Sequence, residues 1–363
     1  MQWRRRIVLL LTILQPILPQ SAEELSAKAD AARAANRLDE AVKLYHEALA
    51  MRPKWAEGWW SLGTIEYDQN LYKDAAEAFR RLTELDSKAG TARIMLGLCE
   101  FELGQEESAL KHIQEGEQIG VVEDKQLRNV ALYHEGVLLQ RAGKFEGAQQ
   151  ALESLCLGGV ETPELDAALG MAVLRIRAKQ PSTAEIANVG HAQCLAAQKK
   201  FDEARALYAQ SVAAHSDFPN IHYAYGRFLL DARDMKAGIA ELQQEIKQQP
   251  NDAIARLQIA AAEYKVDSAA GLPYAEEAVK VAPELPLAHY LLGLLLLDTN
   301  NYKRAIPELE TAERGLPKEA GVYSALGTAY ALAGRDADAG QAREQAAKLR
   351  QQVKGKMAAD EHR

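Results

Sequence analysis

The sequence predicts an all-α fold, a solenoid assembled from repeated helical hairpins, and three observations predict it. The composition is 48% hydrophobic and 26% charged, which is enough apolar surface to bury a core. Strong helix formers such as Ala, Leu, Glu and Gln are abundant, and runs of β-branched residues with period two are missing. Small side chains also recur at a nearly fixed spacing along the 363 residues, which is typical of a repeat array.

The first residues have the pattern of a secretory signal peptide. Residues 1–6 include three arginines, residues 7–18 are mostly apolar, and the small pair Ser21-Ala22 follows. The alternative is a membrane anchor, but as a helix the apolar run spans about 18 Å against a hydrocarbon core of roughly 30 Å. We therefore expect residues 1–22 to be a signal peptide. The remaining chain is expected to have no membrane span and to be exported, either periplasmic or secreted.

The expected mature chain is acidic. Removing residues 1–22 takes away three of the 43 basic residues and no acid, which leaves 40 basic against 51 acidic residues and a net charge of −11. An acidic surface repels phosphate backbones, and the sequence has no basic stripe. Nucleic acid is therefore excluded as an expected partner.

The repeat is visible in ten small residues that we use as anchors. These are Ala29, Gly63, Gly97, Gly136, Gly170, Ala192, Gly226, Ala260, Gly293 and Gly327. The steps between them are 34, 34, 39, 34, 22, 34, 34, 33 and 34 residues. A second small residue and then a large one follow most anchors, as in Ala75 and Phe79 after Gly63.

The pattern resembles the tetratricopeptide repeat, a pair of antiparallel helices in 34 residues. That family expects aromatics at positions 4 and 24, Leu-Gly at 7 and 8, small residues at 20 and 27, and Pro at 32. The second repeat supplies Trp59, Leu62, Gly63, Ala75 and Phe79, and the ninth and tenth repeats match as well. The resemblance covers nearly the whole expected mature chain and implies a right-handed α-solenoid.

Each preference has a steric cause. Positions 8 and 20 lie where the paired helices cross, so only small side chains allow close approach. Position 15 ends the first helix, where a left-handed residue closes the last turn. The residues at this position are Asn36, Asn70, Gly104, Gly143, Asn300 and Gly334. The second helices are predicted to stop before the next repeat at Pro53, Pro250, Pro283 and Pro317.

Some repeats depart from the pattern. Gly116 occupies position 27 of the third repeat and Gly238 occupies position 20 of the seventh, so these repeats are expected to pack loosely or to be shifted by a residue. The 39-residue step is expected to add a loop between Gly120 and Arg128.

The 22-residue step allows two interpretations. Because proline disrupts the interior of a helix, Pro181 is expected to interrupt any helix through residues 175–184. This segment is therefore interpreted as a joint with a kink between two arrays. Alternatively, the hairpin has a very short second helix and stacks normally. The predicted organisation is a signal peptide at 1–22, an array at 23–174, the joint at 175–184, a second array at 185–349 and a polar tail at 350–363.

The usual catalytic motifs are missing from the sequence. There is no phosphate loop, dinucleotide fingerprint or nucleophile elbow, and only His191 and Cys194 have a spacing typical of metal ligands. The acidic residues Glu106, Glu107, Glu115 and Glu117 are interpreted as a solvated helix face. We therefore predict a non-catalytic protein with no cofactor and no metal site.

The three cysteines are Cys99, Cys156 and Cys194. Export would permit a disulfide, with one thiol left over. All three occupy positions where the resembled family packs small or apolar side chains. They are therefore interpreted as buried, unreactive thiols.

A partner is expected in the concave groove that the first helices of such repeats line. By repeat position, the resemblance assigns six groove residues, which are Trp60, Tyr133, Arg141, Tyr223, Arg227 and Tyr290. Aromatic and arginine side chains dominate binding hot spots because they combine a large contact area with hydrogen-bonding groups. The alternative is that the aromatic residues pack against the next repeat.

The expected function is therefore an exported scaffold for protein–protein or protein–peptide interaction. Two alternatives stay open, which are binding of a small ligand or glycan in the groove and an accessory role in an enzyme complex.

Overall fold

The computed structural model describes residues 21–120, 124–177, 183–264 and 266–360, and within these ranges the chain is all helical with no strand, as predicted. Residues 1–20 of the predicted signal peptide lie outside the described residues, as do residues 121–123 of the loop expected between Gly120 and Arg128, and from Lys125 on that segment is helical. The helices are α1 (Ala22–Ala34), α2 (Leu38–Met51), α3 (Ala56–Asp68), α4 (Tyr72–Leu85), α5 (Gly90–Glu102), α6 (Glu106–Ile119), α7 (Lys125–Arg141), α8 (Phe145–Leu157), α9 (Pro163–Val173), α10 (Ala184–Ala197), α11 (Phe201–Ala214), α12 (Ile221–Asp231), α13 (Met235–Gln248), α14 (Ala253–Tyr264), α15 (Ser268–Val281), α16 (Pro286–Asp298), α17 (Tyr302–Gly315), α18 (Ala320–Leu332) and α19 (Asp336–Asp360).

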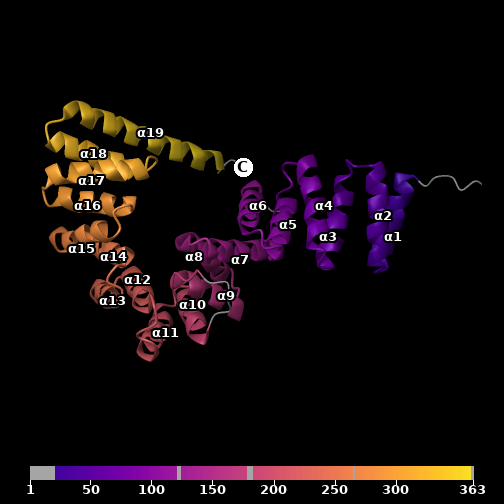
Figure 1. The fold of residues 1–363 in the computed structure, drawn as a ribbon, viewed down its shortest axis with the longest axis horizontal. Coiled ribbons are helices and arrows are strands. Elements are labelled where there is room, and N and C mark those ends of the chain that lie inside the picture. Colours follow the sequence, from indigo (N-terminus) through magenta and orange to yellow (C-terminus); the bar gives the residue numbers. More distant parts are fainter. Residues whose placement is uncertain (1–20, 121–123, 178–182, 265, 361–363) are drawn as a thin grey trace, which may run out of the picture. The chain divides into compact units, whose positions relative to one another are not determined.

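The chain divides into two compact units at residues 138 and 139. In the first unit, α1 pairs with α2, α3 with α4, and α5 with α6 (Figure 1). In the second unit, α12 pairs with α13, and the pairs α14–α15, α16–α17 and α18–α19 follow (Figure 1). The predicted joint at 175–184 lies inside the second unit, and its residues 178–182 are outside the described part of the chain.

The small anchor residues lie where paired helices cross, as predicted. A Cβ added to Gly63 would lie 3.0 Å from the ring of Phe79, and one added to Gly97 would lie 2.9 Å from the carbonyl oxygen of Ala109. At Gly293 an added Cβ would meet the side chain of Leu309 at 2.5 Å. Larger side chains at these positions would push the helices apart, which is the steric reason for the period.

The repeats that depart from the pattern are tightly packed, contrary to the expectation of loose packing. A Cβ on Gly226 would lie 3.0 Å from the carbonyl oxygen of Gly238, and one on Gly238 would lie 2.9 Å from that of Gly226. In the third repeat a Cβ on Gly116 would lie 2.8 Å from the carbonyl oxygen of Gly90. The extra glycines therefore bring the two backbones into closer contact.

The first helices end in a left-handed residue at every position where Asn or Gly predicted one. The six predicted residues all have φ between 55° and 76°. The same position is left-handed in two repeats where it is basic, Lys199 (φ 63°) and Arg233 (φ 68°). The hairpin geometry therefore imposes this conformation even on residues that adopt it at a cost.

Position 4 of the repeat and the preceding proline are joined by a hydrogen bond that the sequence did not predict. The bonds to the proline carbonyl oxygens run from Trp59 Nε1 to Pro53 (2.9 Å), from His289 Nε2 to Pro283 (2.8 Å) and from Tyr323 Oη to Pro317 (3.1 Å). Each side chain combines a ring with a polar N–H or O–H group, so the ring packs against its neighbours while that group satisfies a backbone carbonyl.

The 22-residue step brings α9 and α10 together directly. Gly170 and Gly190 lie at this crossing: a Cβ on Gly170 would be 1.9 Å from the carbonyl oxygen of Ile186, and one on Gly190 would be 1.8 Å from that of Asp166. Helix α10 also packs against α11 and α8. Helix α10 therefore packs against both α9 and α11, so α9 has a full-length packing partner. Neither interpretation of the 22-residue step predicted this arrangement.

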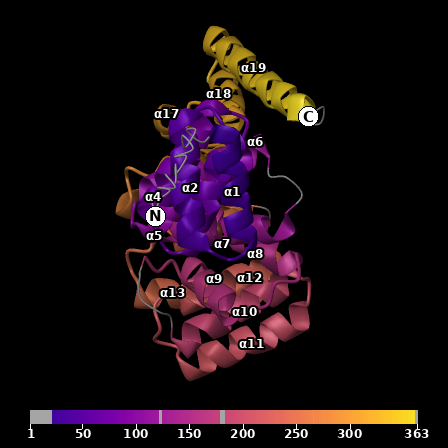
Figure 2. The ribbon, with the colours of Figure 1, turned by 90° about the vertical axis from the view of Figure 1, so that its right-hand side faces the viewer.

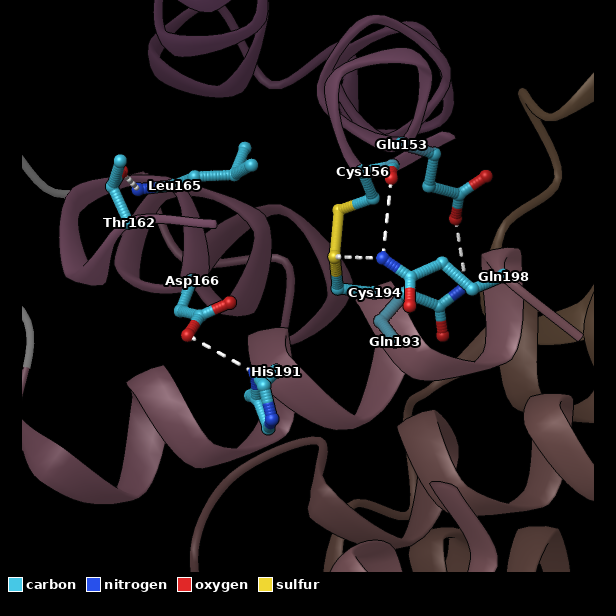
Figure 3. Close-up of a disulfide and its surroundings, with 9 residues drawn as sticks. All are labelled: Glu153, Cys156, Thr162, Leu165, Asp166, His191, Gln193, Cys194 and Gln198. Atoms are coloured by element: carbon cyan, nitrogen blue, oxygen red, sulfur yellow. Dashed lines mark hydrogen bonds and ion pairs between the residues drawn. A yellow bond between two sulfur atoms is a disulfide. The ribbon is translucent and has the colours of Figure 1, made fainter. Parts of the chain in front are cut away.

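The interpretation of Cys156 and Cys194 as free thiols is wrong, because the two form a disulfide between α8 and α10 (Figure 3). Their Cα atoms are 5.5 Å apart. Gln198, the residue that follows α10, donates a hydrogen bond to the Cys156 carbonyl oxygen at 3.2 Å beside the bridge (Figure 3). The short step packs α10 against α8, which repeat positions alone did not reveal. Cys99 is a buried free thiol, as predicted, and burial raises its pKa to about 12.

The last helix is longer than the others. Helix α19 runs for 25 residues to Asp360 and therefore includes most of the segment predicted as a polar tail (Figure 2). In the described part of the chain, no helix combines the length and the apolar character needed to cross a membrane.

Candidate functional site

The predicted groove residues of the first unit are half-buried. Trp60 on α3 packs edge-on against Phe79 on α4, with ring centroids 5.6 Å apart. Tyr133 on α7 lies edge-on to His134 at 5.4 Å. Each ring therefore packs within its own repeat and retains some exposed surface. Its role in binding a partner stays a prediction.

In the second unit, Tyr290 and Arg141 are also half-buried. A Cβ added to Gly321 on α18 would lie 2.4 Å from the Tyr290 hydroxyl, so this tyrosine contacts the next repeat closely. The carbonyl oxygen of Arg141 accepts a hydrogen bond from Arg177 Nε at 3.3 Å.

Tyr223 is not exposed, so its assignment as an accessible groove residue is wrong. Only 1% of its surface reaches solvent. The guanidinium carbons of Arg175 and Arg227 lie 5.4 and 5.9 Å from its ring centroid. Burial raises the pKa of Tyr223, and the two guanidinium charges oppose that rise. Tyr223 therefore serves as a platform on which two arginines are held.

Arg227 belongs to the same cluster. Its Nη1 donates a hydrogen bond to Gln149 Oε1 on α8 at 3.2 Å. Gln149 is buried and in turn donates to the carbonyl oxygen of Ala172 at 3.2 Å. These bonds join α8, α9 and α12, so the arginine is fixed in place within the second unit.

Arg175 is the residue of this cluster that the sequence analysis missed. It follows α9 in the left-handed conformation, with φ 56°. Its guanidinium lies over Phe145 as well as Tyr223, at 5.8 Å from the Phe145 ring centroid, and its Nη1 is 3.8 Å from Asp252 Oδ1. The one available signal was the basic stretch that contains Arg175 and Arg177 in an acidic chain, but its placement depends on the tertiary structure.

A cavity of about 470 Å³ opens beside these arginines. Arg175 and Arg177 line one part of it, and Phe145, Asn220 and Asp252 line others. Its size is within the range of small-molecule and side-chain binding pockets. We call it the arginine pocket.

Two carboxyl groups of the first unit are partly or fully buried, and one of them differs from expectation. Glu117 was assigned to a solvated face, but it is half-buried against Glu135, and burial and that neighbouring carboxyl raise its pKa to about 8. Glu66 is 1% exposed, and burial raises its pKa to about 7, with a smaller contribution from Asp74. His46 Nε2 lies 3.2 Å from Glu66 Oε1.

Two histidines of the second unit form matched pairs with glutamates nineteen residues later. His222 Nδ1 lies 2.6 Å from Glu241 Oε2, and His289 Nδ1 lies 2.6 Å from Glu308 Oε2. The hydrogen bond to Glu241 raises the pKa of His222, and burial opposes the rise. These pairs tie the first helix of each hairpin to the second, which is a structural role. Within the described residues no group of three or more His, Cys, Asp or Glu is placed to hold a metal ion.

Comparison with known proteins identifies the repeats. Residues 26–89, 63–120, 261–320 and 290–353 match one description of the tetratricopeptide repeat, and residues 195–262 match another. A curated human protein, protein O-mannosyl-transferase TMTC3, is 27% identical over 153 residues. The match covers 42% of this chain and 16% of the length of that relative.

Solved structures with a similar course of the chain include MamA from Desulfovibrio magneticus RS-1 and yeast Tom70. The MamA structure is 20% identical with a TM-score of 0.43 and covers 46% of this chain and 96% of its own. Tom70 is 12% identical with a TM-score of 0.37 and covers 90% of this chain and 85% of its own. The repeat matches extend over more than half of the sequence, and the chain therefore belongs to the tetratricopeptide repeat family.

Proposed function

We propose that this chain is an exported, non-catalytic scaffold that holds a partner protein or peptide outside the cytoplasm. Its tetratricopeptide repeats make it a protein-interaction scaffold, because stacked hairpins offer an extended surface on which a partner can dock. The arginine and aromatic side chains of the second unit are of the kinds that dominate binding hot spots. The partner is expected to contact both the aromatic rings and the arginine guanidinium groups of the second unit.

The disulfide is the single observation that carries the exported part of the proposal. Disulfides persist in oxidising compartments and are rare in the cytosol, where thiols are kept reduced. The bridge joins Cys156 and Cys194, which are buried at 1% and 4% exposure and belong to packed helices. The basic and apolar start of the sequence supports the same location, because it has the pattern of a cleaved export signal.

The experiment that tests the proposal is affinity capture from an extracytoplasmic fraction, with mass analysis of the mature N-terminus. Trp60→Ala removes a half-buried aromatic residue of the predicted groove. Tyr264→Ala removes an exposed aromatic residue outside it and is the matched control. A partner retained by the wild type and by Tyr264→Ala, but lost from Trp60→Ala at unchanged helical circular dichroism, is expected.

Three outcomes would contradict the proposal. An uncleaved protein that stays in the cytoplasm would remove the exported part. Saturable binding of a purified sugar, with no protein retained, would favour a glycan binder. An intrinsic hydrolytic or transfer activity of the pure chain would show that it is an enzyme.

A further inference from the structure

The arginine pocket lies where the end of α9, the start of α8 and the turns before α12 and α14 meet. Asn220 fixes one wall, because its Nδ2 donates to the Leu174 carbonyl oxygen at 2.8 Å. Gln249 Nε2 donates to Asn220 Oδ1 at 3.3 Å and extends that wall toward α14. The residues that close the pocket therefore hold one another, and the cavity is a built feature of the second unit.

Arg175 closes α9 in the left-handed conformation, as Arg233 does after α12. Its amide and that of Ile176 close the last turn of α9, with bonds to Ala172 and Met171 carbonyl oxygens at 3.2 and 2.8 Å. A left-handed residue that closes a helix in this way is most often glycine, which has no strain there. An arginine accepts that strain and places its guanidinium at the pocket, between two aromatic rings.

The guanidinium donors at the pocket exceed the acceptors that face them. Asp252 Oδ1 already accepts from the amides of Ile254 and Ala255 at 2.8 and 3.0 Å, so it caps α14. Arg175 Nη1 stays 3.8 Å from that oxygen, and its buried Nε has no hydrogen-bond partner among the described residues. Within the same described part of the chain, Arg177 is exposed, and the hydrogen bond it donates there is from Nε to the Arg141 carbonyl oxygen.

The lining of the pocket differs in the sign of its net charge from the chain as a whole. Two arginines and one aspartate give its lining a net charge of +1, whereas the chain carries −8. One added carboxylate would balance this charge, and a phosphate dianion would exceed it. The planar guanidinium group also matches the geometry of a carboxylate, to which it can donate two parallel hydrogen bonds.

We propose that the arginine pocket binds one carboxylate group of an acidic segment on the partner protein. The carboxylate accepts hydrogen bonds from Arg175 and Arg177, while Phe145 and Pro250 contact the aliphatic part of the bound residue. This inference rests on the proposed scaffold function and names the chemistry by which that scaffold recognises its partner.

Isothermal titration calorimetry on the full mature chain tests the proposal at about 150 mM salt, where long-range attraction is screened. The probe is the capped peptide Gly-Ser-Glu-Asp-Glu-Gly-Ser, and its neutral match is Gly-Ser-Gln-Asn-Gln-Gly-Ser. Arg177→Gln removes the exposed guanidinium, and Arg175→Asn removes the second with a residue that tolerates positive φ. Arg314→Gln on α17 is the control, because it removes the same charge from an exposed arginine outside the pocket.

The acidic peptide is expected to bind the wild type and Arg314→Gln equally and the neutral peptide much more weakly. Arg177→Gln should weaken acidic binding about tenfold, since a charge-assisted hydrogen bond is lost. Equal binding of the two peptides, or an equal loss in Arg314→Gln, would overturn the proposal. So would inorganic phosphate that displaces the peptide at lower concentration than acetate, because the site would then take a phosphate group.

The failure of this inference can be told from the failure of the scaffold function. A partner that is captured equally by the wild type and by Arg177→Gln would leave the scaffold function standing and remove the pocket from it. Circular dichroism of each variant shows whether it is folded, and Arg177→Gln changes an exposed side chain outside the helices, where a loss of fold is not expected.

Discussion

Replacing Gly190 by alanine tests the steric basis of the fold most directly. The added methyl carbon would lie 1.8 Å from the carbonyl oxygen of Asp166, which is about 1.6 Å inside the 3.4 Å at which ordinary contact begins. Both obstacles, that oxygen and the Gly170 amide at 2.6 Å, belong to the backbone of α9, so no side chain can rotate away. The two helices must therefore separate.

The expected cost is about 3 kcal/mol in the free energy of unfolding of the second unit. Overpacking of a core costs about 1–3 kcal/mol and occasionally more, and here rigid backbone pushes the value to the upper end. The gain of about 1 kcal/mol in helix propensity from Gly to Ala offsets part of a larger clash. In urea this corresponds to a midpoint lowered by about 1 M.

The assay uses the distribution of tryptophan. Trp55, Trp59 and Trp60 belong to the first unit, and Trp3 lies in the predicted signal peptide, outside the described residues. The tryptophan fluorescence of the mature chain therefore reports the first unit, while far-ultraviolet circular dichroism reports both units. Gly190→Ala should lower the circular dichroism midpoint and leave the fluorescence midpoint unchanged.

Gly340 provides the matched control. It is exposed in α19, and an added Cβ would meet nothing within 4 Å, so Gly340→Ala should be neutral or stabilising by up to about 1 kcal/mol. If Gly190→Ala and Gly340→Ala had the same stability, the close crossing of α9 and α10 would not be the constraint described above.

Three further predictions concern the disulfide and the titrating groups. Reducing the Cys156–Cys194 bridge, which closes a loop across 38 positions, should lower the free energy of unfolding by about 4 kcal/mol; the denatured, unreduced protein should show one reactive thiol, and three would contradict the bridge. His222 has a raised pKa in the folded state, so its ion pair stabilises the fold fully below the ordinary histidine pKa and less as the pH rises through the folded value. Denaturation of His222→Asn at several pH values should therefore show a deficit that shrinks toward alkaline pH, and a constant deficit would contradict it. Glu66 also has a raised pKa, near 7, so the stability of the wild type should fall as the pH rises through 7. Glu66→Gln should remove that fall and be more stable by up to about 3 kcal/mol at pH 8, and thermal unfolding with the same pH slope as the wild type would refute this.

The sequence predicted the helices, the repeat and the turns because their causes are local. Gly63 and Phe79 are separated by sixteen residues within one hairpin, and the small residue is required whichever hairpin comes next. The left-handed turns at Asn36 and Asn70 were equally predictable, since Asn tolerates positive φ. Lys199 and Arg233 show the limit of that reasoning, because the hairpin imposes the same turn on residues that give no signal.

The candidate site was predicted only in part. Arg227, which was predicted to line the groove, lies in a cluster of arginine and aromatic side chains that the sequence did not predict. Tyr223 is the buried support of that cluster, and Arg175 was not foreseen. Assigning groove residues by repeat position requires that each hairpin stacks on the next in the same way. The 22-residue step breaks that regularity, so near it the repeat position of a residue no longer indicates whether its side chain faces solvent.

The sequence by itself determined that this chain is a helical repeat array, because close packing within each hairpin needs small residues at a fixed spacing. Only the tertiary structure decided which cysteines pair and which arginines converge. Cys156 meets Cys194, and Arg227 meets Gln149, across 38 and 78 positions of the chain. Such contacts depend on the angle at which successive hairpins stack, and that angle is the sum of many packing interactions and is not encoded in any one motif.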